Sequence, residues 1–112
     1  MTRDDPSRVK AILDDIRRFG VTAARVVTRG RERFFDPEDD DQRRIAKSVV
    51  IDLSTAAERL PASFRDAHDD VDWAGIRATR NFIAHDYTGT DDELLWRAIT
   101  VEFPKILAKL GL

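Results

Sequence analysis

Four residues close together in the last third of the sequence carry side chains suited to acid–base and phosphate chemistry. They are Arg80, Asn81, His85 and Tyr87. An imidazole accepts and donates protons near neutral pH, and the forked guanidinium of an arginine stabilises a phosphate on which negative charge develops. The amide of Asn81 can orient the imidazole or donate to a phosphate oxygen, and the phenol of Tyr87 can hydrogen-bond a substrate or stack on a base. This set suits cleavage of RNA without a metal, in which the neighbouring 2′-hydroxyl attacks the phosphate.

A helix that begins at Trp73, with Asp72 as its N-cap, must position these residues. At about 100° per residue, one stripe of this helix is apolar except for its arginine and, where the helix persists, its tyrosine: Trp73, Ile76, Arg80, Ile83 and Tyr87. Burying an unpaired charge costs many kcal/mol, so Arg80 must be paired or must open into a cleft.

Asn81 and His85 are four residues apart and share an adjacent face of this helix. His85 lies about 140° from Arg80 on the helical wheel. The two side chains can therefore converge on one ligand only from a cleft that wraps around the helix, or from two chains across a symmetric interface. Spacing alone favours a plainer account, in which Arg80 is a salt-bridge partner and His85 a capped core histidine.

Apolar residues recur in steps of three and four along two earlier stretches, which predicts helices over about residues 6–28 and 39–60. Asp5-Pro6 is typical of a helix start, and Gly30 of the segment that follows a helix. Pro61 ends the second helix. The apolar face of that helix is broad enough for the core and a second packing surface, which favours a homodimer.

The connecting segments are predicted to be irregular. Residues 34–37 form a loop or turn that places two phenylalanines in the core, and residues 65–70 form a polar linker. Thr88-Gly89 breaks the motif helix. A capping box that opens at Thr90 begins the last helix, and Pro104 should kink that helix or divide it in two.

The composition describes one helical domain, residues 1–112. Hydrophobic residues make up 42% and charged residues 36%, and no alternating strand pattern appears. We therefore expect an all-α antiparallel bundle of four to five helices. The sequence has no cysteine, which excludes disulfides and thiol catalysis. It also shows no membrane-spanning run and no signal peptide, so we expect a cytoplasmic protein without a membrane partner.

The formal net charge is only −2, but charges are grouped in blocks. Arginines concentrate between residues 17 and 33, and we interpret part of this block either as RNA-binding or as a solvated face: Arg25, Arg29, Arg31 and Arg33. Acids at 36–41 suit the start of a helix better than a metal site. His68, which lies among aspartates, is interpreted as an exposed loop histidine. We expect no metal and no cofactor.

The pattern Arg80-x4-His85-x-Tyr87, with Asn81 after the arginine, resembles the R-x4-H-x-Y signature of HEPN ribonucleases. Its surroundings resemble the HepT-like branch, which has a Trp near the helix start, an Arg-Asn pair, an Ala-His step and a Gly-containing turn before an acidic helix with a Trp. Here that last segment runs from Gly89 to Trp96, with Pro104 after it, and Ala56–Leu60 also looks like the family. The resemblance covers nearly the whole chain.

The resemblance implies a toxin of a toxin–antitoxin system that acts as an endoribonuclease. Arg80 and His85 would be the catalytic pair and Asn81 a polar member of the site, in a groove across a homodimer. The partner would be a small nucleotidyltransferase antitoxin of the MntA type, which would adenylylate Tyr87 and so block the site with bulk and negative charge. One departure puts full activity in doubt, because Ser54-Thr55 stands where many relatives have Gly-Glu.

Two other interpretations remain open. In one, the chain is a non-catalytic helical module that pairs with a nucleotidyltransferase and holds a nucleotide phosphate with Arg80, Asn81 and His85. Nucleotide binding without RNA cleavage would distinguish it. In the other, the roles are reversed and this chain is the neutraliser, which growth of cells expressing each partner alone would decide.

Overall fold

The computed structural model describes residues 5–85 and 92–112, and all regular structure within them is helical. This confirms the predicted all-α fold. None of the helices described is long and apolar enough to cross a membrane. In chain order the helices are α1 (Pro6–Arg29), α2 (Arg31–Phe34), α3 (Asp41–Arg59), α4 (Ala62–Ala67), α5 (Trp73–Ala84), α6 (Asp92–Arg97), the π-helical segment η1 (Ala98–Glu102) and α7 (Phe103–Lys109).

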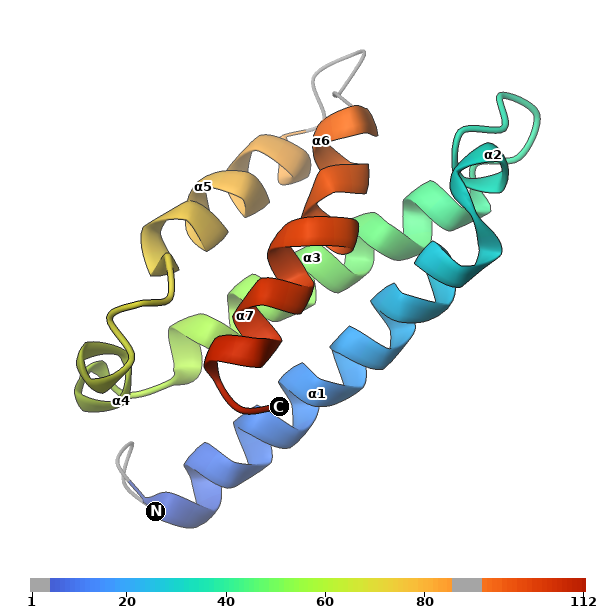
Figure 1. Cartoon of the computed structure of the whole chain (residues 1–112). Coiled ribbons are helices and arrows are strands. Elements are labelled where there is room, and N and C mark those ends of the chain that lie inside the picture. Colours follow the sequence, from blue (N-terminus) through green and yellow to red (C-terminus); the bar gives the residue numbers. More distant parts are fainter. Residues whose placement is uncertain (1–4, 86–91) are drawn as a thin grey trace.

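The long helices form an antiparallel bundle, as predicted. Figure 1 shows α1 and α3 side by side in opposite directions, with α5 on the other flank of α3. The column formed by α6, η1 and α7 packs against both α1 and α3. The buried core draws on every column: Ile12, Ile16, Val49, Leu53, Ile76, Leu95, Ile99 and Phe103.

The broad apolar face of α3 is covered within one chain. Ala46, Val49, Val50 and Leu53 are all buried, and α3 contacts α1 and α5 together with α6 and η1. A central helix with neighbours on several sides needs apolar residues around most of its circumference. The breadth of this face therefore does not argue for a second copy of the chain, contrary to the sequence-based interpretation.

The helix ends follow the capping residues of the sequence. Asp5 Oδ1 accepts the Ser7 N–H at 2.8 Å, and Asp72 Oδ1 accepts the Gly75 N–H at 2.9 Å. Gly30 has a φ of 98°, which favours glycine, and its N–H donates to the Val27 carbonyl oxygen at 3.0 Å. These contacts confirm the predicted starts of α1 and α5 and the predicted end of α1.

The segment after α1 is more regular than predicted. Phe34 belongs to the short helix α2, so the predicted loop at 34–37 is wrong at its first residue. The Arg43 guanidinium donates to the carbonyl oxygens of Phe34 and Asp36, at 2.6 and 2.9 Å. It thereby satisfies two backbone acceptors where α2 ends. Phe34 is fully buried and packs against Trp96, with ring centroids 4.9 Å apart, which confirms its place in the core.

The predicted polar linker at 65–70 is partly helical, because α4 extends to Ala67. A six-residue helix is too short to show a helical period. His68 is half-buried and stacks on Phe64 with ring centroids 4.1 Å apart, so it is not the exposed loop histidine that we expected. Its Nδ1 lies 3.0 Å from the Phe64 carbonyl oxygen.

The sequence predicted a break after the motif helix and a kink or division of the last helix at Pro104. The motif helix ends at Ala84, earlier than the predicted break at Thr88-Gly89, which lies outside the described residues together with the capping residue Thr90. Pro104 divides the last column as predicted: the π-helical turn η1 ends immediately before α7, where the Phe103 N–H donates to the Ala98 carbonyl oxygen.

Candidate active site

Asn81 and His85 emerge on one exposed face at the C-terminal end of α5. The His85 N–H donates to the Asn81 carbonyl oxygen at 3.2 Å, and His85 keeps helical dihedral angles (φ −78°, ψ −11°) as the residue that caps α5. The helical spacing of the two residues is therefore preserved although the helix ends between them. Both side chains are exposed, so this face is open to a ligand or a second chain.

Arg80 lies on the apolar stripe of α5, as the helical wheel predicted. Ile76 and Ile83, one turn before and after it, are 8% and 2% exposed, whereas Arg80 is half-buried. Its Nη1 donates to Asn81 Oδ1 at 3.2 Å. Within residues 5–85 and 92–112, this is the one hydrogen bond that the Arg80 side chain forms. The guanidinium is thus directed from the core stripe toward the exposed face of Asn81.

The structure brings Arg80 and Asn81 together and places Arg80 and His85 on different sides of α5. Arg80 faces the bundle, and His85 faces outward. This arrangement agrees with the angle of about 140° between them. Tyr87 lies outside the described residues.

Two of the four arginines interpreted as RNA-binding, Arg29 and Arg31, form side-chain contacts within the bundle. Arg29 Nη1 donates to Oε1 of Gln42, which is buried, at 3.0 Å. Arg31 forms an ion pair with Glu93 of α6 and lies 4.3 Å above the Phe35 ring. Hydrogen bonds across this pair raise the pKa of Arg31 and lower the pKa of Glu93.

The other two arginines, Arg25 and Arg33, are exposed. Neither side chain forms a hydrogen bond or an ion pair with the part of the chain that the structure describes. They remain candidates for contacts with phosphates, whereas Arg29 and Arg31 have structural roles at the end of the bundle.

A groove between α3 and α5, of about 390 Å³, reaches the motif at Asn81. We call it the α3–α5 groove. Alanines and Ile76 form much of its lining, and its larger or polar side chains are Ser54, Glu58, Arg65, Trp73, Arg77 and Asn81. This set was not predicted from the sequence, although Trp73, Arg77 and Asn81 recur every four residues and so form one ridge of a helix.

The residues that depart from the family pattern lie beside this groove. Ser54 is 2% exposed and lines it. Thr55 is exposed, and its hydroxyl donates to the Ile51 carbonyl oxygen at 3.1 Å. Ser54 is therefore the member of the pair that faces the candidate site.

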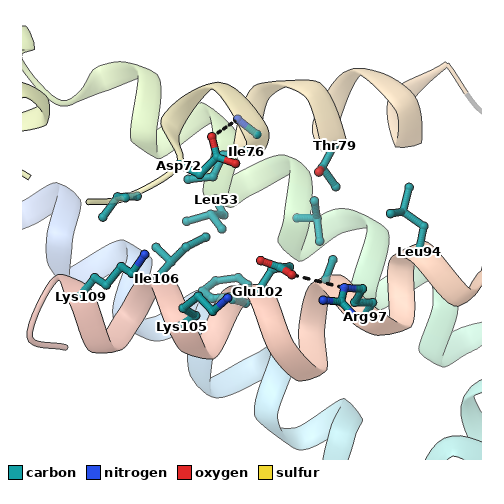
Figure 2. Close-up of a pocket in the computed structure, with 15 residues that line it drawn as sticks. Leu53, Asp72, Ile76, Thr79, Leu94, Arg97, Glu102, Lys105, Ile106 and Lys109 are labelled. Carbon is teal, nitrogen blue, oxygen red and sulfur yellow. Dashed lines mark hydrogen bonds and ion pairs between the residues drawn. The ribbon is translucent and has the colours of Figure 1, made fainter. Parts of the chain in front are cut away.

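A second groove, of about 300 Å³, lies on the opposite flank of α5, against α6, η1 and α7. We call it the α5–α7 groove. Figure 2 shows Leu53 and Ile76 deep in it and Lys105, Lys109 and the Arg97–Glu102 ion pair toward α7. Neither Arg80, Asn81 nor His85 lines this groove. Among the described residues, no three His, Asp or Glu side chains are grouped so that they could hold a metal ion.

The described chain is an all-helical bundle in which Arg80 and Asn81 lie on α5 and His85 caps that helix. Residues 10–111 match the HepT-like family, described as Ribonuclease HepT-like. The chain belongs to this family.

Two curated relatives match the chain. One is "Putative RNase TTE0752" of Caldanaerobacter subterraneus subsp. tengcongensis, 31% identical over 64 residues, or 57% of this chain and 56% of the relative. The other is "Probable ribonuclease HepT" of Thermococcus cleftensis, 25% identical over 57 residues, or 51% of this chain and 52% of the relative. The chain thus spans about half the length of each relative. No solved structure matches the chain.

Proposed function

We propose that this protein is a metal-independent endoribonuclease and that Arg80, Asn81 and His85 form its active site. The observation that carries the proposal is the half-buried Arg80, which is hydrogen-bonded to Asn81 on the helix that His85 caps. An apolar side chain would suit this position of the stripe better if it served packing alone. Membership of the HepT-like family supports the same conclusion.

The reaction proposed is an intramolecular transesterification. The 2′-hydroxyl of one nucleotide loses its proton to a base and attacks the adjacent phosphorus, while the P–O bond to the next nucleotide breaks. The products are a 2′,3′-cyclic phosphate and a free 5′-hydroxyl, which gains a proton as the bond breaks. His85 is the group that exchanges protons with these oxygens, and Arg80 stabilises the charge on the phosphate.

The separation of Arg80 and His85 around α5 calls for a second copy of the chain. In a symmetric dimer, Arg80 of one protomer and His85 of its partner can face the same phosphate. Phe82, which is 41% exposed on the outward side of α5, supplies an apolar contact for such an interface. The homodimer is therefore part of the proposal.

We also propose that the protein is the toxin of a toxin–antitoxin system. Its partner would be a nucleotidyltransferase antitoxin of the MntA type that adenylylates Tyr87, two residues after His85. An added nucleotide would bring a negative phosphate close to Arg80 and compete with RNA for it. Intact mass after co-expression with the partner would test this modification, and an unmodified Tyr87 in the neutralised toxin would contradict it.

The purified chain should cleave RNA in the presence of EDTA and leave 2′,3′-cyclic phosphate ends. The His85→Ala and Arg80→Ala variants should each lose about 10²-fold or more in rate, since general acid–base catalysis and charge stabilisation contribute at that level. His68→Gln is the matched control, because His68 is the other histidine of the chain and stacks on Phe64 just after α4 ends.

Cleavage retained in both site variants would contradict the assignment. RNA or nucleotide binding by a wild-type chain that does not cleave would instead support the non-catalytic module that pairs with a nucleotidyltransferase.

A further inference from the structure

The α3–α5 groove continues the candidate active site along α5. Trp73, Arg77 and Asn81 form its α5 wall, and Ser54 and Glu58 belong to the opposite wall on α3. Its volume of about 390 Å³ is within the range of small-ligand sites. Because Asn81 belongs both to this groove and to the hydrogen bond with Arg80, a ligand in the groove lies next to the motif.

The apolar part of the groove suits a flat ring. Ile76 and Ala57 are buried beneath it. Trp73 is half-buried, and its indole N–H donates to the carbonyl oxygens of Arg65 and His68, at 3.2 and 3.0 Å. These bonds fix the orientation of the indole, so the ring is held ready without further loss of side-chain freedom.

The polar part of the groove suits a ligand with donors and acceptors at its edge. Arg77 Nε lies 3.2 Å from Glu58 Oε1, and both side chains are more than half exposed. Ser54 contributes a buried hydroxyl. Arg65 has its Nε shielded from solvent, without a hydrogen-bond partner among the residues described. Guanidinium planes and aromatic rings are the surfaces on which unpaired RNA bases stack, and carboxylates, amides and hydroxyls bind base edges.

We infer that the α3–α5 groove holds an unpaired nucleobase of an RNA chain, adjacent to the phosphate bound at Arg80 and Asn81. This inference rests on the proposed function in taking RNA as the substrate. The α5–α7 groove also has cationic residues on its rim, but no motif residue lines it, so a base held there would not be adjacent to that phosphate.

Tryptophan fluorescence can test this inference because the chain has two tryptophans, Trp73 and Trp96. Trp96 packs against Phe34 and Phe35, away from the groove. In the full chain carrying His85→Ala and Trp96→Phe, a short single-stranded RNA should change the emission of Trp73. The same RNA backbone without bases should bind more weakly and leave the emission unchanged.

Removal of Arg77 should weaken RNA binding. In the His85→Ala background, Arg77→Ala should raise the Kd about tenfold, the effect of losing stacking on one base. Arg97→Ala is the matched control, because Arg97 is paired with Glu102, at 3.4 Å, in the other groove and is similarly exposed. It should change the Kd less than twofold. Each of the four free nucleoside 5′-monophosphates should be tested as a competitor, and at least one should compete for the groove, whereas ribose 5-phosphate should not.

The outcomes separate this inference from the proposed function. An unchanged Trp73 emission with bound RNA, equal effects of Arg77→Ala and Arg97→Ala, or no binding of RNA at all would each overturn the base site. Base-dependent binding by a wild-type chain that never cleaves RNA would leave the base site standing and overturn the nuclease.

Discussion

Arg80 occupies a position that an apolar residue would fill in an ordinary amphipathic helix. Its neighbours on the stripe, Ile76 and Ile83, are buried, and its guanidinium must be kept partly hydrated beside them. Residues that serve a site often cost stability, so replacing this cation should stabilise the fold. We expect Arg80→Met to raise the free energy of unfolding by about 1 kcal/mol and to abolish cleavage.

Thermal and denaturant unfolding, together with an RNA cleavage assay, measure both effects of this change. Arg77→Met is the control for stability, because Arg77 is exposed and its replacement removes only a surface ion pair. A marked loss of stability in Arg80→Met would mean that the arginine serves the fold and not the site.

Two arginines near the end of α1, Arg29 and Arg33, should contribute differently to stability and to RNA binding. Arg29→Ala leaves the buried Gln42 amide oxygen without its partner and should destabilise the fold by about 1–2 kcal/mol. Arg33→Ala should leave stability unchanged but reduce the dependence of RNA affinity on log salt concentration by about 1. Unfolding curves and binding titrations at several salt concentrations would check both, and a reversed pattern would refute the division of these residues.

The long helices could be predicted from the sequence because their apolar residues repeat with the helical period. The ends marked by Asp5, Gly30 and Asp72 could also be predicted, since each supplies a specific local hydrogen bond or a positive φ. Helix α4 could not, because it is short and is held in place by Trp73, whose indole N–H donates to the carbonyl oxygens of Arg65 in α4 and of His68 just after it. Such contacts join segments that share no repeating sequence pattern, so the sequence does not reveal them.

Gly20 lies within α1, where this helix packs against α7. A Cβ atom at Gly20 would lie 2.5 Å from Leu107 Cδ1, so the Leu107 side chain would have to move to admit a larger residue there. We expect Gly20→Ala to destabilise the protein by about 1 kcal/mol, since overpacking outweighs the gain in helix propensity.

The sign should reverse when the steric conflict is removed. In a Leu107→Ala background, Gly20→Ala should become stabilising, because only the propensity gain remains. Denaturant unfolding of the four variants of this cycle would measure the change. Equal effects of Gly20→Ala in both backgrounds would show that Leu107 is not the limiting contact.

The ion pair between Arg31 and Glu93 joins α2 to α6 and should make stability depend on pH. The pair lowers the pKa of Glu93 below its ordinary value of 4.5, so the folded state favours the carboxylate. Stability from this pair is present above the ordinary value and is lost as pH falls through the lowered pKa.

We therefore expect Glu93→Gln to be less stable than the wild-type chain at pH 7, and we expect this difference to vanish in acid. Unfolding curves between pH 7 and pH 2 would follow it. High salt should also reduce the difference at pH 7, because both partners are exposed. A difference that stays constant with pH would exclude the ion pair as its source.

The sequence predicted which residues of the site share a face of the motif helix, but it did not predict which residues of other helices surround them. The helical wheel separated Arg80 from His85, as the structure does, because that separation depends on α5 alone, whereas the hydrogen bond from Arg80 to Asn81 was not predicted. The α3–α5 groove was missed, since it depends on how α3 and α5 pack, and Ser54 and Arg77 are far apart in sequence. The proposed completion of the site by a second chain would depend on an interface, which no local sequence pattern encodes.

A site shared between protomers makes a definite prediction for mixed dimers. Arg80→Ala and His85→Ala should each be inactive alone. A dimer that contains one chain of each kind has one site with both residues intact, if Arg80 and His85 act from opposite protomers. Random assembly then makes half of the dimers mixed, and the mixture should regain about a quarter of the wild-type cleavage rate.

The two variants should be refolded together, and the cleavage rate of the mixture should be measured. In the control mixture, the Arg80→Ala/His85→Ala double variant replaces one of the two, so that no intact site can form. Sedimentation equilibrium would establish that the mixtures are dimeric, and Phe82→Asp, which places a charge on the proposed interface, should reduce both dimerisation and the regained activity. A mixture no more active than its parents, although dimeric, would place the whole site within one chain. Arg80 and His85 would then have to reach one phosphate around α5 itself.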